Sequence, residues 1–238
     1  GFILTPEVTN CVSVSRRHQE SVLCLEADDP TLAGLRTEAA ALGVWLSIGS
    51  LALKTGDADG RFANRSFVIN PAGDIIARYD KIHMFDVEVS EKETYRESAG
   101  YRPGAWAVTA QTPFGQLGLS ICYDLRFAYL FRALAQAGAD ILLVPSAFSP
   151  VTGAAHWQPL LQARAIETGC YVLASAQLGD HGGRKTYGHS MAISPWGEVL
   201  VDAGTTKSVS VVDIDLGAVS DARKRIAALS HDRKFEGP

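Results

Sequence analysis

The 238-residue chain has little excess charge of either sign. Its 22 lysines and arginines stand against 26 aspartates and glutamates, which gives a net charge of −4. A protein that binds nucleic acid or an anionic membrane surface usually carries a basic stripe that follows the phosphates. The charge balance therefore disfavours both kinds of partner, and we expect a small-molecule ligand.

Cysteine is scarce, and the spacing of the cysteines does not match a metal-binding motif. The four cysteines are Cys11, Cys24, Cys122 and Cys170, and no two of them form a C-x-x-C pair. This argues against a zinc knuckle and against a disulfide framework, so reduced thiols in a cytoplasmic compartment are expected. No apolar run approaches the length of a membrane span. Residue 1 is Gly and a strand-like run follows at once, which leaves an upstream targeting segment open.

The chain also lacks the short motifs of three large protein classes. It has no H-E-x-x-H, no G-x-G-x-x-G and no P-loop pattern, so metalloprotease, dinucleotide-binding and nucleotide-binding functions have no support. None of its six histidines has a spacing that marks it as the partner of a cysteine nucleophile. We therefore expect no metal and no cofactor, and a carboxylate or an amine beside any nucleophile.

Cys122 lies where an apolar strand pattern changes to a helical one. Apolar residues alternate with small ones up to Ile121, and from Phe127 onward they recur at helical spacing. This places Cys122 at the carboxyl end of a strand, where open α/β folds bind ligands. The unpaired N–H groups of the helical turn favour an anion, so a stabilised thiolate is expected. The alternative is a buried cysteine that packs as a small hydrophobic residue.

Glu7 has a similar position, because it follows a short apolar strand over residues 2–5. Three turns that contain Pro and Gly, at 70–73, 112–115 and 194–197, predict β-hairpins. Buried strands alternate with helices elsewhere, which predicts an α/β fold with a helix-covered mixed sheet or two facing sheets. The other predicted strands are 44–49, 141–144, 170–176 and 209–214, and the predicted helices are 30–42, 156–168 and a basic one that contains 223–225.

Three segments resemble, in their order, the nitrilase superfamily of carbon–nitrogen hydrolases. They are Pro6-Glu7, Tyr79-Asp80-Lys81-Ile82-His83 and Ile121-Cys122-Tyr123-Asp124-Leu125-Arg126-Phe127. The resemblance covers nearly the whole chain and implies a four-layer α-β-β-α sandwich in one domain over residues 1–238. The first strand and helix of that family are absent here, so we expect an amino-terminally truncated domain. The resemblance also implies a cofactor-free amidase that forms a homodimer or a higher homo-oligomer.

The same resemblance implies a Glu-Lys-Cys triad. Cys122 would attack the amide carbonyl to form a thioester, with Glu7 as general base. Lys81, with the Tyr123 N–H as a hypothesis, would stabilise the oxyanion. Glu97 resembles the family's second glutamate, which helps to hold the lysine and the substrate, and its alternative is a surface carboxylate.

Segments 149–157, 164–168 and 187–191 look closest to the deaminated glutathione amidase branch of the superfamily. Its substrates are ω-amides of α-keto dicarboxylic acids. The omega-amidase branch, which acts on α-ketoglutaramate, is the near neighbour, and nitrile or N-carbamoyl hydrolysis is a further alternative. From a different class come a non-catalytic binding protein that bears a reactive thiol and an inactive fragment.

An anionic substrate requires a cation or several N–H donors besides Lys81. The glycine-rich loop 179–187 follows a buried strand and bears Arg184 and Lys185, so we predict a mobile lid that binds the substrate. The alternative is an exposed basic loop. We expect Asp124 and Arg126 to form a structural ion pair or cap, and Trp157, on the apolar side of a helix, to belong to the core.

Overall fold

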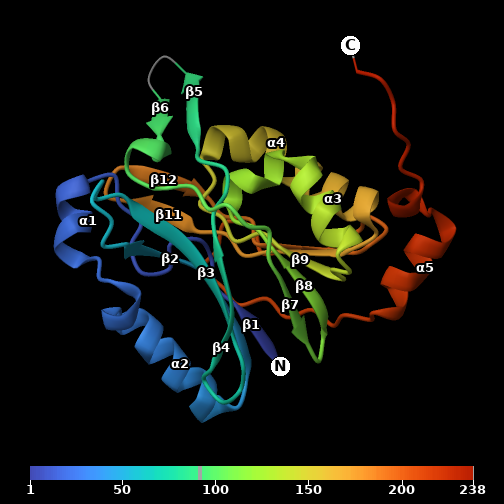
Figure 1. Ribbon diagram of the computed structural model, residues 1–238, viewed down its shortest axis with the longest axis horizontal. Coiled ribbons are helices and arrows are strands. Elements are labelled where there is room, and N and C mark those ends of the chain that lie inside the picture. Colours follow the sequence, from blue (N-terminus) through green and yellow to red (C-terminus); the bar gives the residue numbers. More distant parts are fainter. Residues whose placement is uncertain (91–92, 238) are drawn as a thin grey trace.

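Two β-sheets lie face to face in the middle of the molecule, with helices outside them (Figure 1). The computed structural model describes residues 1–90 and 93–237. In that part of the chain, one sheet has four strands in the order β1-β2-β3-β4 and the other has six in the order β14-β13-β10-β9-β8-β7, while β5–β6 and β11–β12 form separate pairs. The strands are β1 Phe2–Leu4, β2 Trp45–Lys54, β3 Phe62–Ile69, β4 Ile75–Asp80, β5 Asp86–Ser90, β6 Glu93–Arg96, β7 Thr109–Thr112, β8 Gly115–Leu119, β9 Ile141–Leu143, β10 Tyr171–Ala174, β11 Leu178–His181, β12 Arg184–Tyr187, β13 Met191–Ile193 and β14 Val199–Asp202.

Local sequence signals mark several of the helix ends. In α2 the Asp29 side chain caps the first turn by accepting from Leu32 N at 2.8 Å. Both α2 and α4 end at a glycine in the left-handed region, Gly43 at φ 62° and Gly169 at φ 59°. The α-helices are α1 Arg16–Val22, α2 Pro30–Leu42, α3 Ala128–Gln136, α4 Pro150–Thr168 and α5 Gly217–Arg225, and 3₁₀ turns span Glu26–Asp28, Glu97–Ala99, Cys122–Arg126 and Ala228–Ser230.

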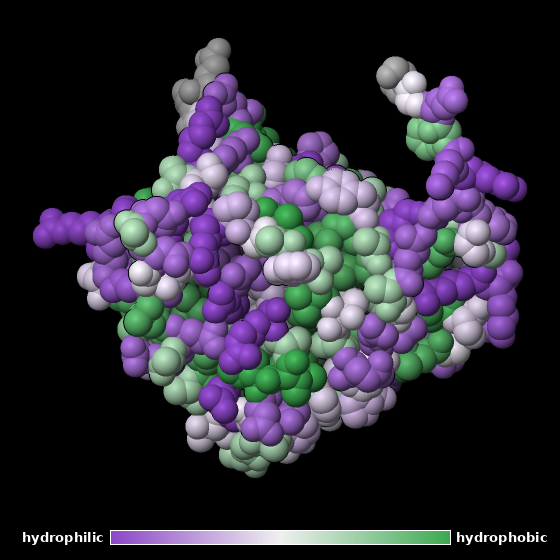
Figure 2. All heavy atoms as spheres, viewed as in Figure 1, coloured by the Kyte–Doolittle hydropathy of each residue, from purple (hydrophilic) through white to green (hydrophobic). Residues whose placement is uncertain are grey.

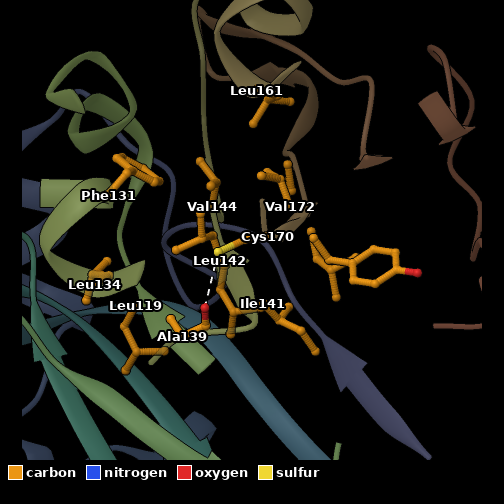
Figure 3. Packing of buried hydrophobic residues seen from close by; sticks show 14 of the residues in the cluster. Leu119, Phe131, Leu134, Ala139, Ile141, Leu142, Val144, Leu161, Cys170 and Val172 are labelled. Carbon is orange, nitrogen blue, oxygen red and sulfur yellow. Dashed lines mark hydrogen bonds between the residues drawn. The ribbon is translucent and has the colours of Figure 1, made fainter. Parts of the chain in front are cut away.

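The largest apolar cluster joins the two sheets to the helices α3 and α4. It contains Val68 and Tyr79 from the four-stranded sheet together with Leu117 and Leu119 from the six-stranded one. Figure 3 shows its centre around Leu142, where the Cys170 thiol donates a hydrogen bond to the Ala139 carbonyl at 3.2 Å. Helix α2 contacts β2 on the outer face of the four-stranded sheet. The predicted four-layer α-β-β-α sandwich is therefore confirmed.

Strands β8, β9 and β10 are parallel neighbours, so their carboxyl ends meet at one edge of the six-stranded sheet. The three predicted hairpins are also present, as β3–β4, β7–β8 and β13–β14. In each turn the glycine has a positive φ, which an L side chain adopts only with strain: Gly73, Gly115 and Gly197.

Three predictions about the elements differ from the structure. Helix α4 begins at Pro150 rather than at 156, because Pro150 occupies the first helical position. The helix predicted from Phe127 onward is present as α3, with Phe127 at its N-cap position after the 3₁₀ turn. Loop 179–187 is the hairpin β11–β12. The stretch 209–214 is not a strand: Val209 and Val211 are 92% and 84% exposed, and in the described chain no strand lies in register beside them to accept their backbone bonds.

The surface mixes residue types. Figure 2 shows hydrophobic residues reaching the surface between hydrophilic ones on the face drawn. Among residues 1–90 and 93–237, no helix combines the length and the apolar character that crossing a membrane requires.

Candidate active site

Three strand ends bring the predicted triad together. Glu7 follows β1, Lys81 follows β4 directly, and Cys122 follows β8. The Lys81 Nζ lies 3.0 Å from Glu7 Oε1, and Cys122 lines the same cavity as both residues. The three residues are buried, with exposed fractions of 3%, 2% and 7% for Glu7, Lys81 and Cys122. The structure therefore places all three side chains at one buried point.

The Glu7 carboxylate is held by more partners than the triad supplies. Asn64 Nδ2 donates to Oε1 at 2.9 Å, and the Ala147 N–H donates to Oε2 at 2.8 Å. Neither residue was predicted from the sequence. Asn64 has a signal there, a polar residue within the apolar strand β3, whereas a backbone N–H such as that of Ala147 leaves none. Fixed on both oxygens, the carboxylate keeps one orientation toward Cys122.

Glu97 joins this cluster, as the resemblance implied. Its two carboxylate oxygens each lie 2.9 Å from Lys81 Nζ, and one of them accepts from the Phe85 N–H at 2.6 Å. The Lys81 ammonium is thus held between two carboxylates, Glu7 and Glu97. With only 15% of its side chain exposed, Glu97 is not a surface carboxylate.

The backbone is strained at the nucleophile and beside the base. Cys122 has φ 50° and Val8, the residue after Glu7, has φ 46°. A left-handed conformation costs a non-glycine residue about 1–3 kcal/mol, and such residues cluster at functional sites. Hydrogen bonds hold both, because Val8 N donates to Ser50 Oγ at 2.7 Å and Cys122 N donates to the Pro145 carbonyl at 2.9 Å.

Gly49 lies where the supports of Glu7 and Cys122 meet. A Cβ added to it would lie 2.1 Å from the Thr5 carbonyl oxygen, 2.5 Å from the Pro6 carbonyl oxygen and 2.5 Å from Pro145 Cβ. Thr5 and Pro6 lead to Glu7, and Pro145 binds the backbone of Cys122. Only glycine lets β2 approach both segments this closely.

The charges of Glu7 and Lys81 stabilise each other. Burial alone raises the pKa of Glu7, but the positive charges of Lys81 and Arg184 and the hydrogen bonds from Cys122 and Lys81 outweigh it, so the pKa lies below its ordinary value. Burial alone lowers the pKa of Lys81, but the carboxylates of Glu7 and Glu97 hold it well above its ordinary value. At neutral pH Glu7 is therefore ionised and Lys81 is protonated.

The resting nucleophile is a thiol, so the expectation of a stabilised thiolate is wrong. Burial, and then the negative charge of Glu7, raise the pKa of Cys122 far above its ordinary value, and Lys81 offsets only part of the rise. A protonated thiol beside an ionised carboxylate suits general-base catalysis, because the carboxylate can accept the thiol proton as the sulfur attacks.

The described residues enclose a cavity of about 460 Å³ above the cluster. Tyr123 and Arg184, two of the predicted site residues, line it together with Ser149, which was not predicted. Lys185 is exposed and is not among the lining residues, since successive residues of a strand point to opposite faces. In the place of the predicted lid loop, the turn of the hairpin β11–β12 uses Gly182 and Gly183 at φ 65° and 98°.

Other residues near the nucleophile have structural contacts. Asp124 is fully buried and accepts from the Tyr79 hydroxyl, the His83 N–H and the Ile121 N–H at 2.6, 3.0 and 2.8 Å. Asp124 therefore caps the Cys122 turn, which is one of the two roles expected from the sequence, a cap or an ion pair. The expected ion pair with Arg126 is not formed, because Asp124 faces inward to these donors. Trp157 is fully buried in the core, as predicted.

The carbon–nitrogen hydrolase family model matches residues 1–224. A deaminated glutathione amidase of Yersinia enterocolitica is 40% identical over 238 residues, which are 98% of this chain and 82% of the relative. Among solved structures, the Caenorhabditis elegans NitFhit protein superposes with a TM-score of 0.89 at 36% identity, over 98% of this chain and 57% of that one. Saccharomyces cerevisiae Nit3, a member of branch 10 of the nitrilase superfamily, superposes with a TM-score of 0.86 at 26% identity, over 98% and 83%.

Proposed function

The chain belongs to the carbon–nitrogen hydrolase family, and on that premise we propose that it hydrolyses the ω-amide of an α-keto dicarboxylic acid such as deaminated glutathione. Glu7, Lys81 and Cys122 carry the reaction through a thioester. The observation that supports this best is the buried Cys122 side chain in one cavity with a Glu7 carboxylate that Lys81, Asn64 and the Ala147 N–H hold in place.

Acylation begins when the Cys122 thiol gives its proton to Glu7 and its sulfur attacks the amide carbonyl carbon. The carbonyl oxygen becomes an oxyanion, which the Lys81 ammonium and the Tyr123 N–H stabilise. Glu7 then returns the proton to the amide nitrogen, and the carbon–nitrogen bond breaks. The amine leaves, and the acyl group stays on the sulfur as a thioester.

Deacylation reverses the roles with water in place of the amine. Glu7 takes a proton from water, and the hydroxide formed attacks the thioester carbonyl. The oxyanion forms at the same place and is stabilised by the same donors. When the carbon–sulfur bond breaks, the proton passes from Glu7 to the Cys122 sulfur, which restores the resting thiol.

Glu97 keeps Lys81 charged and in place in this scheme. Glu7 alone already favours the protonated form of Lys81. The second carboxylate, that of Glu97, makes loss of the Lys81 proton still more unfavourable. Glu7 Oε1 and both Glu97 oxygens accept from Nζ, so the oxyanion shares the ammonium with these two carboxylates. Glu97 touches neither the nucleophile nor the base in the described contacts, so it is a positioning residue.

The substrate assignment is supported by the curated relatives, several of which are named deaminated glutathione amidase. Deaminated glutathione keeps the amide that joins a five-carbon α-keto acid to a cysteinylglycine amine. Acceptance of α-ketoglutaramate with rejection of the larger amide would assign the chain to omega-amidase activity instead.

The test is steady-state hydrolysis of four substrates with identification of the products by mass spectrometry. The panel is deaminated glutathione, α-ketoglutaramate, an aliphatic nitrile and an N-carbamoyl amino acid, with Cys122→Ala as the inactive control. We expect cysteinylglycine and α-ketoglutarate from the first substrate and the highest kcat/KM for it. Carbon dioxide released with ammonia from the fourth at a higher kcat/KM would contradict the proposal.

We further propose that the chain forms a homodimer or a higher homo-oligomer in the cytoplasm. Large apolar residues are exposed on neighbouring helices, Tyr129 on α3 by 66% and Val151 on α4 by 58%. The four cysteines are free thiols, which fits a reducing compartment. Light scattering should give at least twice the mass of one chain, and a monomer at micromolar concentration would refute the association.

A further inference from the structure

We infer that the first turn of α4, with the Ser149 hydroxyl and the Arg184 guanidinium, forms the subsite for the carboxylate at the far end of the substrate's acyl chain. The inference rests on the proposed amidase function and names the groups that select an anionic acyl chain. Three features carry it: an unpaired buried hydroxyl, an unpaired cation and an uncapped helix end, all at the cavity.

Ser149 occupies the N-cap position of α4 but does not cap the helix. A serine there normally accepts a hydrogen bond from a backbone N–H of the first turn, and no such bond is formed. The residue is only 5% exposed and lines the cavity. Its Oγ is buried with no hydrogen-bond partner among residues 1–90 and 93–237. A buried polar atom without a partner is rare in a native protein and points to a ligand that supplies one.

The amino end of α4 favours an anion. The helix has 19 residues, Pro at its first position and no acidic residue in its first turn. Its first N–H groups have no acceptor within the helix, and the helix dipole places positive potential there. With no carboxylate of the helix itself and no serine cap to satisfy them, these donors are left for a bound anion.

Arg184 supplies the charge at this place. Strand β12 lies against the start of α4, since Tyr187 N donates to the Phe148 carbonyl at 2.9 Å. Of the cavity's arginines, Arg16 binds backbone carbonyls and Glu20, and Arg96 binds Glu88. Arg184 lines the same cavity, and within the described ranges its guanidinium forms neither a hydrogen bond nor an ion pair.

The subsite is at the right reach from the reacting atoms. The Ala147 N–H binds Glu7, and Ser149 follows two residues later, so at most about 7 Å of chain separates them. In an α-keto ω-amide the carboxylate lies four carbon–carbon bonds from the scissile carbonyl, about 5 Å in an extended chain. Since Cys122, Ser149 and Arg184 line the same cavity, we place the carboxylate of an acyl chain attached at Cys122 at the start of α4.

The test compares α-ketoglutaramate with pentanamide, a neutral amide with the same number of carbons. Arg184→Met should lower kcat/KM for α-ketoglutaramate at least about tenfold, mainly through KM, and Ser149→Ala at least about threefold. Both variants should leave pentanamide within about twofold of the parent. Lys185→Met is the matched control, because it removes the same charge from the opposite face of β12 and should change neither substrate.

Two further measurements make every outcome decisive. Pentanoylglycine carries its carboxylate on the leaving side, so a loss confined to that substrate would overturn the assignment to the acyl chain. Equal losses on α-ketoglutaramate and pentanamide would also overturn it. If the parent hydrolyses no amide, the proposed function fails, but glutarate should still slow alkylation of Cys122 by iodoacetamide in the parent and not in Arg184→Met. Equal protection in both proteins would refute the subsite itself.

Discussion

Replacement of Lys81 by Met removes the charge at the centre of the buried cluster and keeps the side-chain volume. Two carboxylates then remain beside each other without the ammonium that binds both, Glu7 at 3% and Glu97 at 15% exposure. Loss of one partner of a buried ion pair costs about 3–5 kcal/mol. For a chain of this size each kcal/mol shifts the melting temperature by about 2–4 °C, so the melting temperature should fall by about 6–20 °C at pH 7.

The loss of stability in Lys81→Met, relative to the parent, should become smaller as the pH falls. In the parent, the pKa of Glu7 is depressed by Lys81, so this stabilisation is present above the ordinary value of 4.5 and is lost as the pH falls through the folded-state pKa. In Lys81→Met, burial instead raises the pKa of Glu7 above that value, and the resulting destabilisation is relieved as the pH falls. Urea unfolding at pH 7 and pH 5 should show a smaller difference between the two proteins at pH 5.

Activity should respond differently from stability. Loss of one oxyanion donor costs about 10²–10³ in kcat, which steady-state hydrolysis of α-ketoglutaramate measures. Adding Glu97→Gln to Lys81→Met removes one unpaired charge, so the double variant should recover part of the stability and none of the rate. Turnover of Lys81→Met within threefold of the parent, or a double variant with simply additive stability losses, would refute the reasoning.

Other predictions concern the supports of the site. Gly49→Ala should destabilise the fold by at least about 1–3 kcal/mol and reduce kcat, because the added Cβ has no room. Gly34→Ala is the control, since this glycine faces open space on α2 and its replacement should not destabilise the fold. Equal melting temperatures for the two variants would contradict this prediction. Glu97→Gln should retain measurable activity, and a loss as complete as that of a nucleophile variant would make Glu97 essential. For a non-titrating substrate, kcat/KM should not change between about pH 5.5 and 9.5, because the pKa of Glu7 lies below 4.5 and that of Lys81 above 10.5. A fall in kcat/KM on the acid side with its midpoint above pH 6 would be inconsistent with an ionised Glu7.

The sequence predicted the layers because they leave local signals, and it predicted the triad because three segments resemble the nitrilase superfamily. Alternation up to Ile121 and the Pro and Gly turns each report backbone geometry over a few residues, and the sandwich follows from them together with the resemblance. The stretch 209–214 shows the limit: its apolar alternation is typical of a strand, but a strand also requires a neighbour in register, which no local pattern reports.

The parts of the site that were missed depend on long-range contacts. The bond from the Ala147 N–H to Glu7 joins residues 140 positions apart, and a backbone donor has no side-chain signature. The prediction of a Cys122 thiolate was wrong for a related reason. It was based on the helical turn after the strand, whose N–H groups stabilise an anion. Burial and the neighbouring Glu7 charge outweigh that local effect. The sequence alone could not tell that Arg184 lines the cavity while Lys185 does not. That prediction requires the pairing of β11 with β12, which fixes the face of the strand on which each side chain lies.

The covalent step is tested most directly by intact-mass spectrometry of the protein quenched in acid during turnover. With α-ketoglutaramate as substrate, the parent should gain the mass of one five-carbon α-keto acyl group, and peptide mapping should place it on Cys122. The adduct should be absent from Cys122→Ala and should disappear when the substrate is exhausted. Steady turnover with no adduct at any quench time, or an adduct of the same mass on Cys122→Ala, would contradict the thioester mechanism.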